Sequence, residues 1–239
     1  VERLLHRLVR VLDQPDDQGC GGPVADHLHA LRPGTLVDGY EIVSFLGSGG
    51  FGITYLGRDV ALDKPVAIKE YMPSDLAVRQ QTLTVSPKSG QDKADFDWGL
   101  DRFLDEARTL ARFDHPNVVK VSRFFRAHGT AYIVMEHVSG ETLSEVLKRK
   151  GRLGEAELRG LVEGLLSGLE AVHAADYLHR DIKPGNVILR PDGTPVLLDF
   201  GSARQSVTAK SRSVTAIVTP GYAPIEQYSS RGNQGPWTD

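Results

Sequence analysis

The chain has 239 residues, of which 40% are hydrophobic and 25% are charged, so it can bury a sizeable core and could hold one domain of two lobes. Its net charge of −3 does not indicate the basic surface that binds nucleic acid. The single cysteine, Cys20, cannot form an internal disulfide, and no apolar run approaches the roughly 18 residues of a membrane span. Residues 1–10 lack the apolar core of a signal peptide. We therefore expect a cytoplasmic protein with no membrane span in this chain.

The first 35 residues are expected to lie outside the folded domain. Residues 1–13 predict a short amphipathic helix, because four leucines recur at helical spacing while arginines occupy the rest of its surface. Residues 14–34 are rich in Gly, Asp and Pro and predict a linker. So short a helix is marginal alone, which favours a surface helix over one that binds a partner or a membrane surface.

A β pattern begins at Tyr40 and predicts three antiparallel strands, at residues 40–47, 51–59 and 64–71. Residues 89–97 are predicted to form a polar connection. A helix is predicted over Trp98 to Phe113, where apolar residues recur on a helical period.

Two more strands are predicted at residues 118–128 and 130–137, which gives a sheet of five strands with one helix. After Gly140 the period becomes helical, over residues 142–150 and 155–174. The second of these helices carries an apolar stripe that we expect to be buried, formed by Leu158, Leu161, Val162, Leu165, Leu166, Leu169 and Val172. The fold class is therefore α+β, with a β-rich half followed by a helical half.

One segment carries most of the functional information: residues 179–186 read HRDIKPGN, and Asp199-Phe200-Gly201 follows. Asp181 could accept the proton of an attacking hydroxyl, and Lys183 could neutralise charge on a phosphoryl group in transfer. Asn186 and Asp199 supply the oxygen ligands that Mg²⁺ prefers. With a glycine loop and a VAIK segment upstream in the right order, this pattern is typical of protein kinases and very hard to assemble by chance.

Residues 36–239 resemble bacterial Hanks-type Ser/Thr protein kinases, on the segments GGFGITYL, IKEYMPSDLAVR, FLDEARTLARF and TPGYAPIEQY. The Lys183-Pro184 pair resembles Ser/Thr kinases more than tyrosine kinases. The resemblance implies a bilobal fold with an N-lobe at residues 36–138 and part of a C-lobe at 139–239. It also implies ATP and Mg²⁺ as cofactors and proteins with Ser or Thr as substrates.

The glycine loop consists of Gly47, Ser48, Gly49, Gly50, Phe51 and Gly52. It satisfies GxGxxG, but strands are predicted on both sides of it, whereas a dinucleotide-binding loop leads from a strand into a helix. We therefore reject a Rossmann dehydrogenase. In a hairpin, the glycines would let the backbone approach phosphates closely, and Phe51 could cover them; a plain structural glycine turn is the alternative.

Lys69 ends the VAIK segment. Because a strand alternates faces, Ala67 and Lys69 point the same way, so Ala67 leaves room for adenine while Lys69 reaches the phosphates. By resemblance, Glu106 takes the ion-pair position beside Lys69. Asp105 is the rival carboxylate, about 100° around the helix.

The resemblance also implies positions around the adenine ring. Thr54 would lie over the ring, Met135 would be the gatekeeper, and the backbone of Glu136 and Val138 would form the hinge. Ile188 would lie beneath the ring. A plain buried Met and Ile would look identical in the sequence.

The region from Gly201 to Pro224 resembles an activation segment. Its hydroxyl residues could be autophosphorylated, in trans if the chain forms a dimer, and Arg180 could pair with an added phosphate. Thr219 resembles the threonine that bridges the catalytic aspartate and lysine. The hydroxyl residues are Ser202, Ser206, Thr208, Ser211, Ser213, Thr215 and Thr219.

The sequence departs from the family pattern at Ile225, which stands where the Pro of an APE motif is expected, with Glu226 in register. It ends at Asp239, which resembles the first residue of the long C-lobe helix, whose carboxylate in kinases caps the backbone around HRD. We therefore expect a C-lobe that is incomplete after the activation segment. The sequence predicts a Ser/Thr protein kinase; the alternatives are an ATP-binding interaction module, an inactive kinase fragment, or a small-molecule phosphotransferase.

Overall fold

The computed structural model describes residues 29–50, 52–80, 82–200, 204–205, 219–229 and 232–239. These residues fall into two compact units, one within His27–Ser139 and one within Gly140–Asp239, and we describe each by itself. The helix predicted over residues 1–13, most of the predicted linker, and Phe51 lie outside the described residues. Within the described ranges, no helix is long and apolar enough to cross a membrane.

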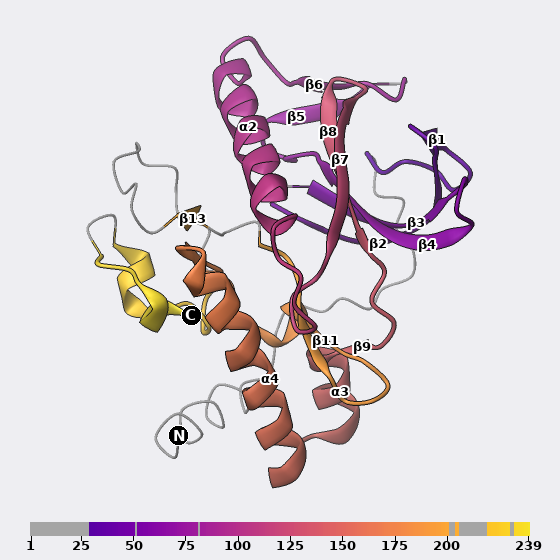
Figure 1. The fold of residues 1–239 in the computed structure, drawn as a ribbon. Coiled ribbons are helices and arrows are strands. Elements are labelled where there is room, and N and C mark those ends of the chain that lie inside the picture. The colour runs from indigo at the N-terminus through magenta and orange to yellow at the C-terminus, as the bar shows by residue number, and fades with distance from the viewer. Residues whose placement is uncertain (1–28, 51, 81, 201–203, 206–218, 230–231) are drawn as a thin grey trace. The chain divides into compact units, whose positions relative to one another are not determined.

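The first unit is built on a six-stranded antiparallel sheet with the order β1-β2-β3-β4-β8-β7, and one long helix, α2, contacts β7 and β8 (Figure 1). The five longer strands confirm the predicted ones. The two-residue β1 and the short β5–β6 hairpin were not predicted, because two or three residues carry no readable period. The elements are β1 (Leu36–Val37), β2 (Tyr40–Gly49), β3 (Gly52–Asp59), β4 (Lys64–Tyr71), β5 (Ala77–Arg79), β6 (Val85–Pro87), α2 (Lys93–Leu110), β7 (Val121–Ala127) and β8 (Thr130–Glu136).

The helix α2 begins five residues before the predicted start at Trp98, so the prediction of a polar connection through Asp97 was wrong. The reason is Phe96, which is buried and packs against Tyr71 with ring centroids 5.2 Å apart. Phe96 extends the buried face of the helix by one turn, whereas Trp98 is partly exposed. The helix also ends at Leu110, three residues before Phe113.

A buried carboxylate, Glu70, organises the core of the first unit. Its oxygens accept hydrogen bonds from Tyr55 (2.8 Å), Tyr132 (2.6 Å) and the Arg79 guanidinium. Burial, reinforced by the Glu70 charge, raises the pKa of both tyrosines far above the usual range, so their hydroxyls remain protonated donors. Arg79 also donates to the carbonyl of His29 and so ties the entry of the described chain to the sheet.

Among its described residues, the second unit contains two α-helices, three short 3-10 helices and three small β-ladders. A reciprocal capping box starts α3, in which the Thr142 hydroxyl accepts from the Glu145 amide and the Glu145 carboxylate accepts from the Thr142 amide. β12, β11 and β9 form one sheet, and β10 pairs with β13. The elements are β9 (Glu141–Thr142), α3 (Leu143–Lys150), α4 (Glu155–Ala174), β10 (Tyr177–Leu178), η1 (Pro184–Asn186), β11 (Val187–Leu189), β12 (Pro195–Leu197), β13 (Arg204–Gln205), η2 (Ile225–Tyr228) and η3 (Pro236–Thr238).

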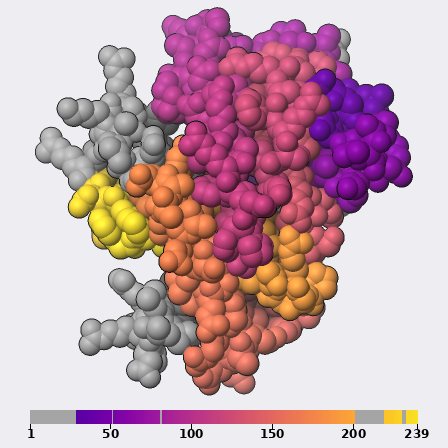
Figure 2. Space-filling view, in the orientation of Figure 1, coloured from indigo at the N-terminus to yellow at the C-terminus, as the bar shows by residue number. Residues whose placement is uncertain are grey.

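The helix α4 has the predicted bounds, but fewer of its apolar residues are buried than predicted. Much of this helix lies at the surface (Figure 2), and Leu166 is 48% exposed. Leu158 is only half-buried. The burial of the other five predicted residues is confirmed: Leu161, Val162, Leu165, Leu169 and Val172.

Candidate active site

The first unit places Lys69 and Glu106 together. Lys69 Nζ on β4 lies 3.5 Å from Glu106 Oε1 on α2, and each side chain is only 10% exposed. Asp105, the rival carboxylate, instead pairs with Arg102 and Arg108 on the more exposed side of the helix. The predicted ion pair is therefore confirmed. A buried lysine held by a carboxylate is a fixed positive charge, which suits it to phosphate binding.

The strands of the first unit also bring several of the predicted adenine positions to one face. Thr54 on β3 is paired directly with Lys69, and Met135 on β8 is paired with Ala67. Directly paired residues project to the same side of a sheet, so all four side chains share the face that carries Lys69. Ile68 and Glu70, which alternate with them, are fully buried on the other face.

The glycine loop is the β2–β3 hairpin, in which Gly49 pairs with Gly52. This confirms strands on both sides of the loop. Gly52 has no room for a side chain, because a Cβ there would lie 1.9 Å from the carbonyl oxygen of Glu70. A Cβ on Gly47 or Gly49 would meet nothing within 4 Å, so the arm of the hairpin is open at these positions.

The predicted hinge positions lie at the end of β8 and two residues beyond it. Glu136 is exposed, and its amide donates to the carbonyl of Lys120 at 2.9 Å. Val138 is buried. Ile188, predicted to lie beneath adenine, belongs to β11 in the second unit, where it pairs with Val196 and Thr142.

In the second unit, three side chains hold the carboxylate of Asp181. Thr219 Oγ1 donates to Oδ1 at 2.7 Å, Lys183 Nζ lies 2.9 Å from Oδ2, and Asn186 Nδ2 donates to Oδ2 at 2.8 Å. Lys183 also donates to Thr219 Oγ1 at 3.1 Å, so the expected bridge by Thr219 is present. This arrangement fixes a carboxylate, an ammonium and a hydroxyl around one point.

The histidine of HRDIKPGN, His179, is fully buried, and burial lowers its pKa, so the imidazole is neutral. Its Nδ1 accepts from the Asp181 amide at 3.3 Å, which leaves Nε2 to donate to the Leu198 carbonyl at 2.8 Å. Its ring lies 4.3 Å from that of Phe200. His179 therefore connects the Asp181 loop to the strand that leads to Asp199.

The carboxylate of Asp239 caps this loop, as the resemblance implied. Oδ2 accepts from the His179 amide at 2.8 Å, and Oδ1 accepts from the Arg180 amide at 2.6 Å. His173 Nε2 lies 2.8 Å from Oδ2, and the Asp239 side chain has no exposed surface. The loop backbone is thus tied to a buried anion.

The oxygen donors for a cation come from two places in the second unit. Because the Asn186 NH₂ group donates to Asp181, its amide oxygen is the atom left to ligate a metal. Asp199 is exposed and has a φ of 51°, while Phe200 beside it is buried. An amide and a carboxylate oxygen fit Mg²⁺, a hard cation that takes its remaining ligands from phosphate and water.

The family comparison agrees with this geometry, since the protein kinase domain family matches residues 40–237. The chain belongs to this family. Similar kinases include the serine/threonine-protein kinase PknA of Nostoc sp., 35% identical over 80% of this chain and 33% of the relative, and PknL of Mycobacterium tuberculosis, 34% identical over 87% and 48%. The solved structure titled "PpkA-294 apo form" is 41% identical, with a TM-score of 0.77 over 88% of this chain and 74% of that one.

These relatives confirm the α+β protein kinase fold and the resemblance to bacterial Ser/Thr kinases. The chain spans about a third to a half of the length of the curated kinases it matches.

The sequence did not single out two residues that support the loop that begins at His179. His173 contacts Asp239, and Gln227 Nε2 donates to the Arg180 carbonyl at 2.8 Å. A polar residue that is nearly buried, as Gln227 is, leaves no periodic signal in a sequence. Six of the predicted activation-segment hydroxyls lie outside the described residues: Ser202, Ser206, Thr208, Ser211, Ser213 and Thr215.

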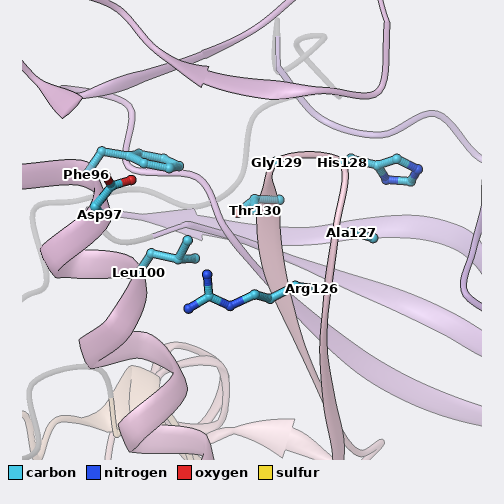
Figure 3. Close-up of a pocket in the computed structure, with 8 residues that line it drawn as sticks. All are labelled: Phe96, Asp97, Leu100, Arg126, Ala127, His128, Gly129 and Thr130. Carbon is cyan, nitrogen blue, oxygen red and sulfur yellow. The ribbon is translucent and has the colours of Figure 1, made fainter. Parts of the chain in front are cut away.

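The first unit also has a hollow of about 400 Å³ that includes none of the predicted site residues (Figure 3). It lies between the first turns of α2 and the β7–β8 turn. None of the predicted nucleotide-binding residues lines this hollow, whose walls are Phe96, Asp97, Leu100, Arg126, Ala127, His128, Gly129 and Thr130.

Proposed function

We propose that this chain is a Ser/Thr protein kinase catalytic domain that transfers the γ-phosphate of ATP to a protein hydroxyl. The observation that carries the proposal is the Asp181 carboxylate, held by Thr219, Lys183 and Asn186. Positioned groups of this kind supply most of the catalysis in phosphoryl transfer. An interaction module that only held ATP would have no use for a carboxylate fixed in this way.

Each residue then has a distinct task. Asp181 orients the substrate hydroxyl and takes its proton as the hydroxyl oxygen bonds to the γ-phosphorus and the bond to the leaving ADP oxygen breaks. Lys183 offsets charge on the transferring group. Lys69, fixed by Glu106, binds the α- and β-phosphates. Asn186 and Asp199 would hold Mg²⁺, which when bound neutralises charge on the phosphates.

The remaining proposed contacts follow the family pattern. The glycine loop would cover the phosphates, and Thr54, Ala67, Ile188 and the hinge would surround adenine. Because ATP is made and used in the cytoplasm, we propose a cytoplasmic location. We also propose that two copies of the chain meet for phosphorylation of the activation segment in trans.

The test is phosphate transfer from labelled ATP to a Ser/Thr peptide. We expect Asp181→Asn to reduce kcat by about 10²-fold or more and to leave ATP affinity within a few-fold, because Asp181 acts on the hydroxyl. Asp192→Asn is a matched control, since Asp192 is an exposed aspartate of the same unit whose interactions are with its neighbours, among them the Thr194 amide, which donates to Oδ1. Wild-type turnover in Asp181→Asn would place the base elsewhere. ATP binding without transfer in the wild type would favour the interaction module.

A further inference from the structure

Arg180, next to the proposed base, has an unusual backbone conformation. Its φ is 69°, in the left-handed region that residues with a side chain rarely occupy. Such a conformation costs free energy and persists only where surrounding contacts enforce it. The contacts around Arg180 therefore indicate which residues hold the loop in place.

Both peptide groups that flank the Arg180 Cα are fixed. In the preceding group, the Arg180 amide donates to Asp239 Oδ1 at 2.6 Å. In the following group, the Arg180 carbonyl accepts from Gln227 Nε2 at 2.8 Å, while the Asp181 amide donates to His179 Nδ1. A peptide group held at its oxygen and its N–H cannot rotate, so these contacts set φ and ψ of Arg180 together.

Three side chains hold these peptide groups: Asp239, His179 and Gln227. Of these, Gln227 is an uncharged side chain from a distant part of the sequence. It lies in η2, between Thr219 and Asp239, and only 3% of its surface is exposed. An apolar residue of the same size would fill this position without the cost of burying an amide. The burial of an amide here is explained by its hydrogen bond to the Arg180 carbonyl.

We infer that Gln227 is a positioning residue for phosphoryl transfer, which acts through the Arg180 carbonyl to hold the backbone of Asp181. The inference rests on the proposed kinase function. The segment that begins at Thr219 thereby controls Asp181 twice, through the side chain at Thr219 and through the backbone at Gln227. Release of either contact would misplace the carboxylate relative to a substrate hydroxyl.

Two variants test this inference. Gln227→Met keeps the volume and removes the donor, and Gln227→Glu keeps the shape but places a carboxylate oxygen against the carbonyl. We expect both to lower kcat by about tenfold or more with the KM for ATP within twofold, since small misplacements of a reacting group are costly. Hydrogen exchange should accelerate at the amides of Arg180 and Asp181, because their partners would no longer be fixed.

Gln234→Glu is the matched control. Gln234 belongs to the same segment and donates at 3.4 Å to the carbonyl of Glu226, not to the loop. It should retain wild-type kcat and wild-type exchange at Arg180 and Asp181.

Wild-type kcat and exchange in both Gln227 variants would overturn the inference. So would a loss of kcat accompanied by faster exchange across the whole second unit, which would mean that Gln227 only stabilises the fold. If the wild type transfers no phosphate, the proposed function fails, but local exchange at Arg180 and Asp181 still decides whether Gln227 holds the loop.

Discussion

The proposed base is oriented by three side-chain contacts and by one fully buried ring, that of His179. Asp181 contacts Thr219, Lys183 and Asn186 through its side chain, and the His179 ring accepts from its amide. His179 has no exposed surface and performs two hydrogen-bonding tasks that only the neutral ring can perform at once. Protonation of this ring would remove the acceptor at Nδ1 and place a charge in the core.

This predicts a pH dependence of stability. Burial lowers the pKa of His179 from its ordinary value of 6.5, so below about pH 6.5 the unfolded chain binds a proton that the folded chain does not. The free energy of unfolding should fall as pH decreases from 6.5 towards the lower folded pKa, and should be fully restored above 6.5. Urea titrations between about pH 5 and 7.5 should show a flatter slope for His179→Gln. Leu169→Ala, a buried change in the same unit, should lower stability without flattening the slope.

At the residue scale, the sequence predicted those contacts that a motif encodes. The Lys69–Glu106 pair and the Thr219 bridge are both present, because spacing within a family motif fixes which residues meet. Gln227 and His173 could not be predicted in this way. Their partners lie 47 and 66 residues away in the sequence, and only the folded chain brings them together.

At the element scale, strands were easier to predict than the ends and faces of helices. The alternation at the start of β2 and along β3 was readable because the sheet buries side chains there at every second position. β4 was readable from its VAIK segment instead, since its last four residues are all buried. The start of α2 was misplaced because Phe96 lies in an otherwise polar stretch, and its burial depends on Tyr71. Leu166 was wrongly assigned to the core. The apolar periodicity of a helix does not show how much of its apolar face the neighbouring elements cover.

The geometry of the β2–β3 hairpin predicts that Gly52 does not tolerate a side chain. Gly52→Ala should lower the free energy of unfolding by more than about 2 kcal/mol, because its Cβ would overlap the backbone oxygen of Glu70, which cannot move without disrupting the sheet. Gly47→Ala is the control, since a Cβ there has open space and should change stability by less than about 1 kcal/mol. The measurement is urea unfolding of the three proteins. Equal stability of the two variants would mean that β3 and β4 separate more easily than their pairing implies.

At the scale of the whole molecule, the predicted nucleotide-binding residues and the ion-pair partner of Lys69 are divided between two stretches of the chain. Lys69 and Glu106 belong to His27–Ser139, and Asn186 and Asp199 belong to Gly140–Asp239. The order of motifs along the chain was sufficient to predict the α+β kinase fold, which the family match over residues 40–237 confirms. Sequence order alone could not predict the buried network around Glu70, because its four side chains come from four separate strands.

If residues of both units contribute to nucleotide binding, Mg-ATP should stabilise the folded chain, and a substitution in either unit should reduce that stabilisation. A ligand at 100 times its Kd adds about 2.7 kcal/mol to the folded state, which corresponds to a rise of about 5–10 °C in Tm for a chain of this size. We expect this rise with Mg-ATP, a smaller one with ATP and EDTA, and a strongly reduced one in Lys69→Met and in Asn186→Ala. Arg149→Met is the control, because Arg149 forms only an exposed ion pair with Glu141. A full rise in both site variants, or a rise that is indifferent to Mg²⁺, would show that the nucleotide binds elsewhere on the molecule.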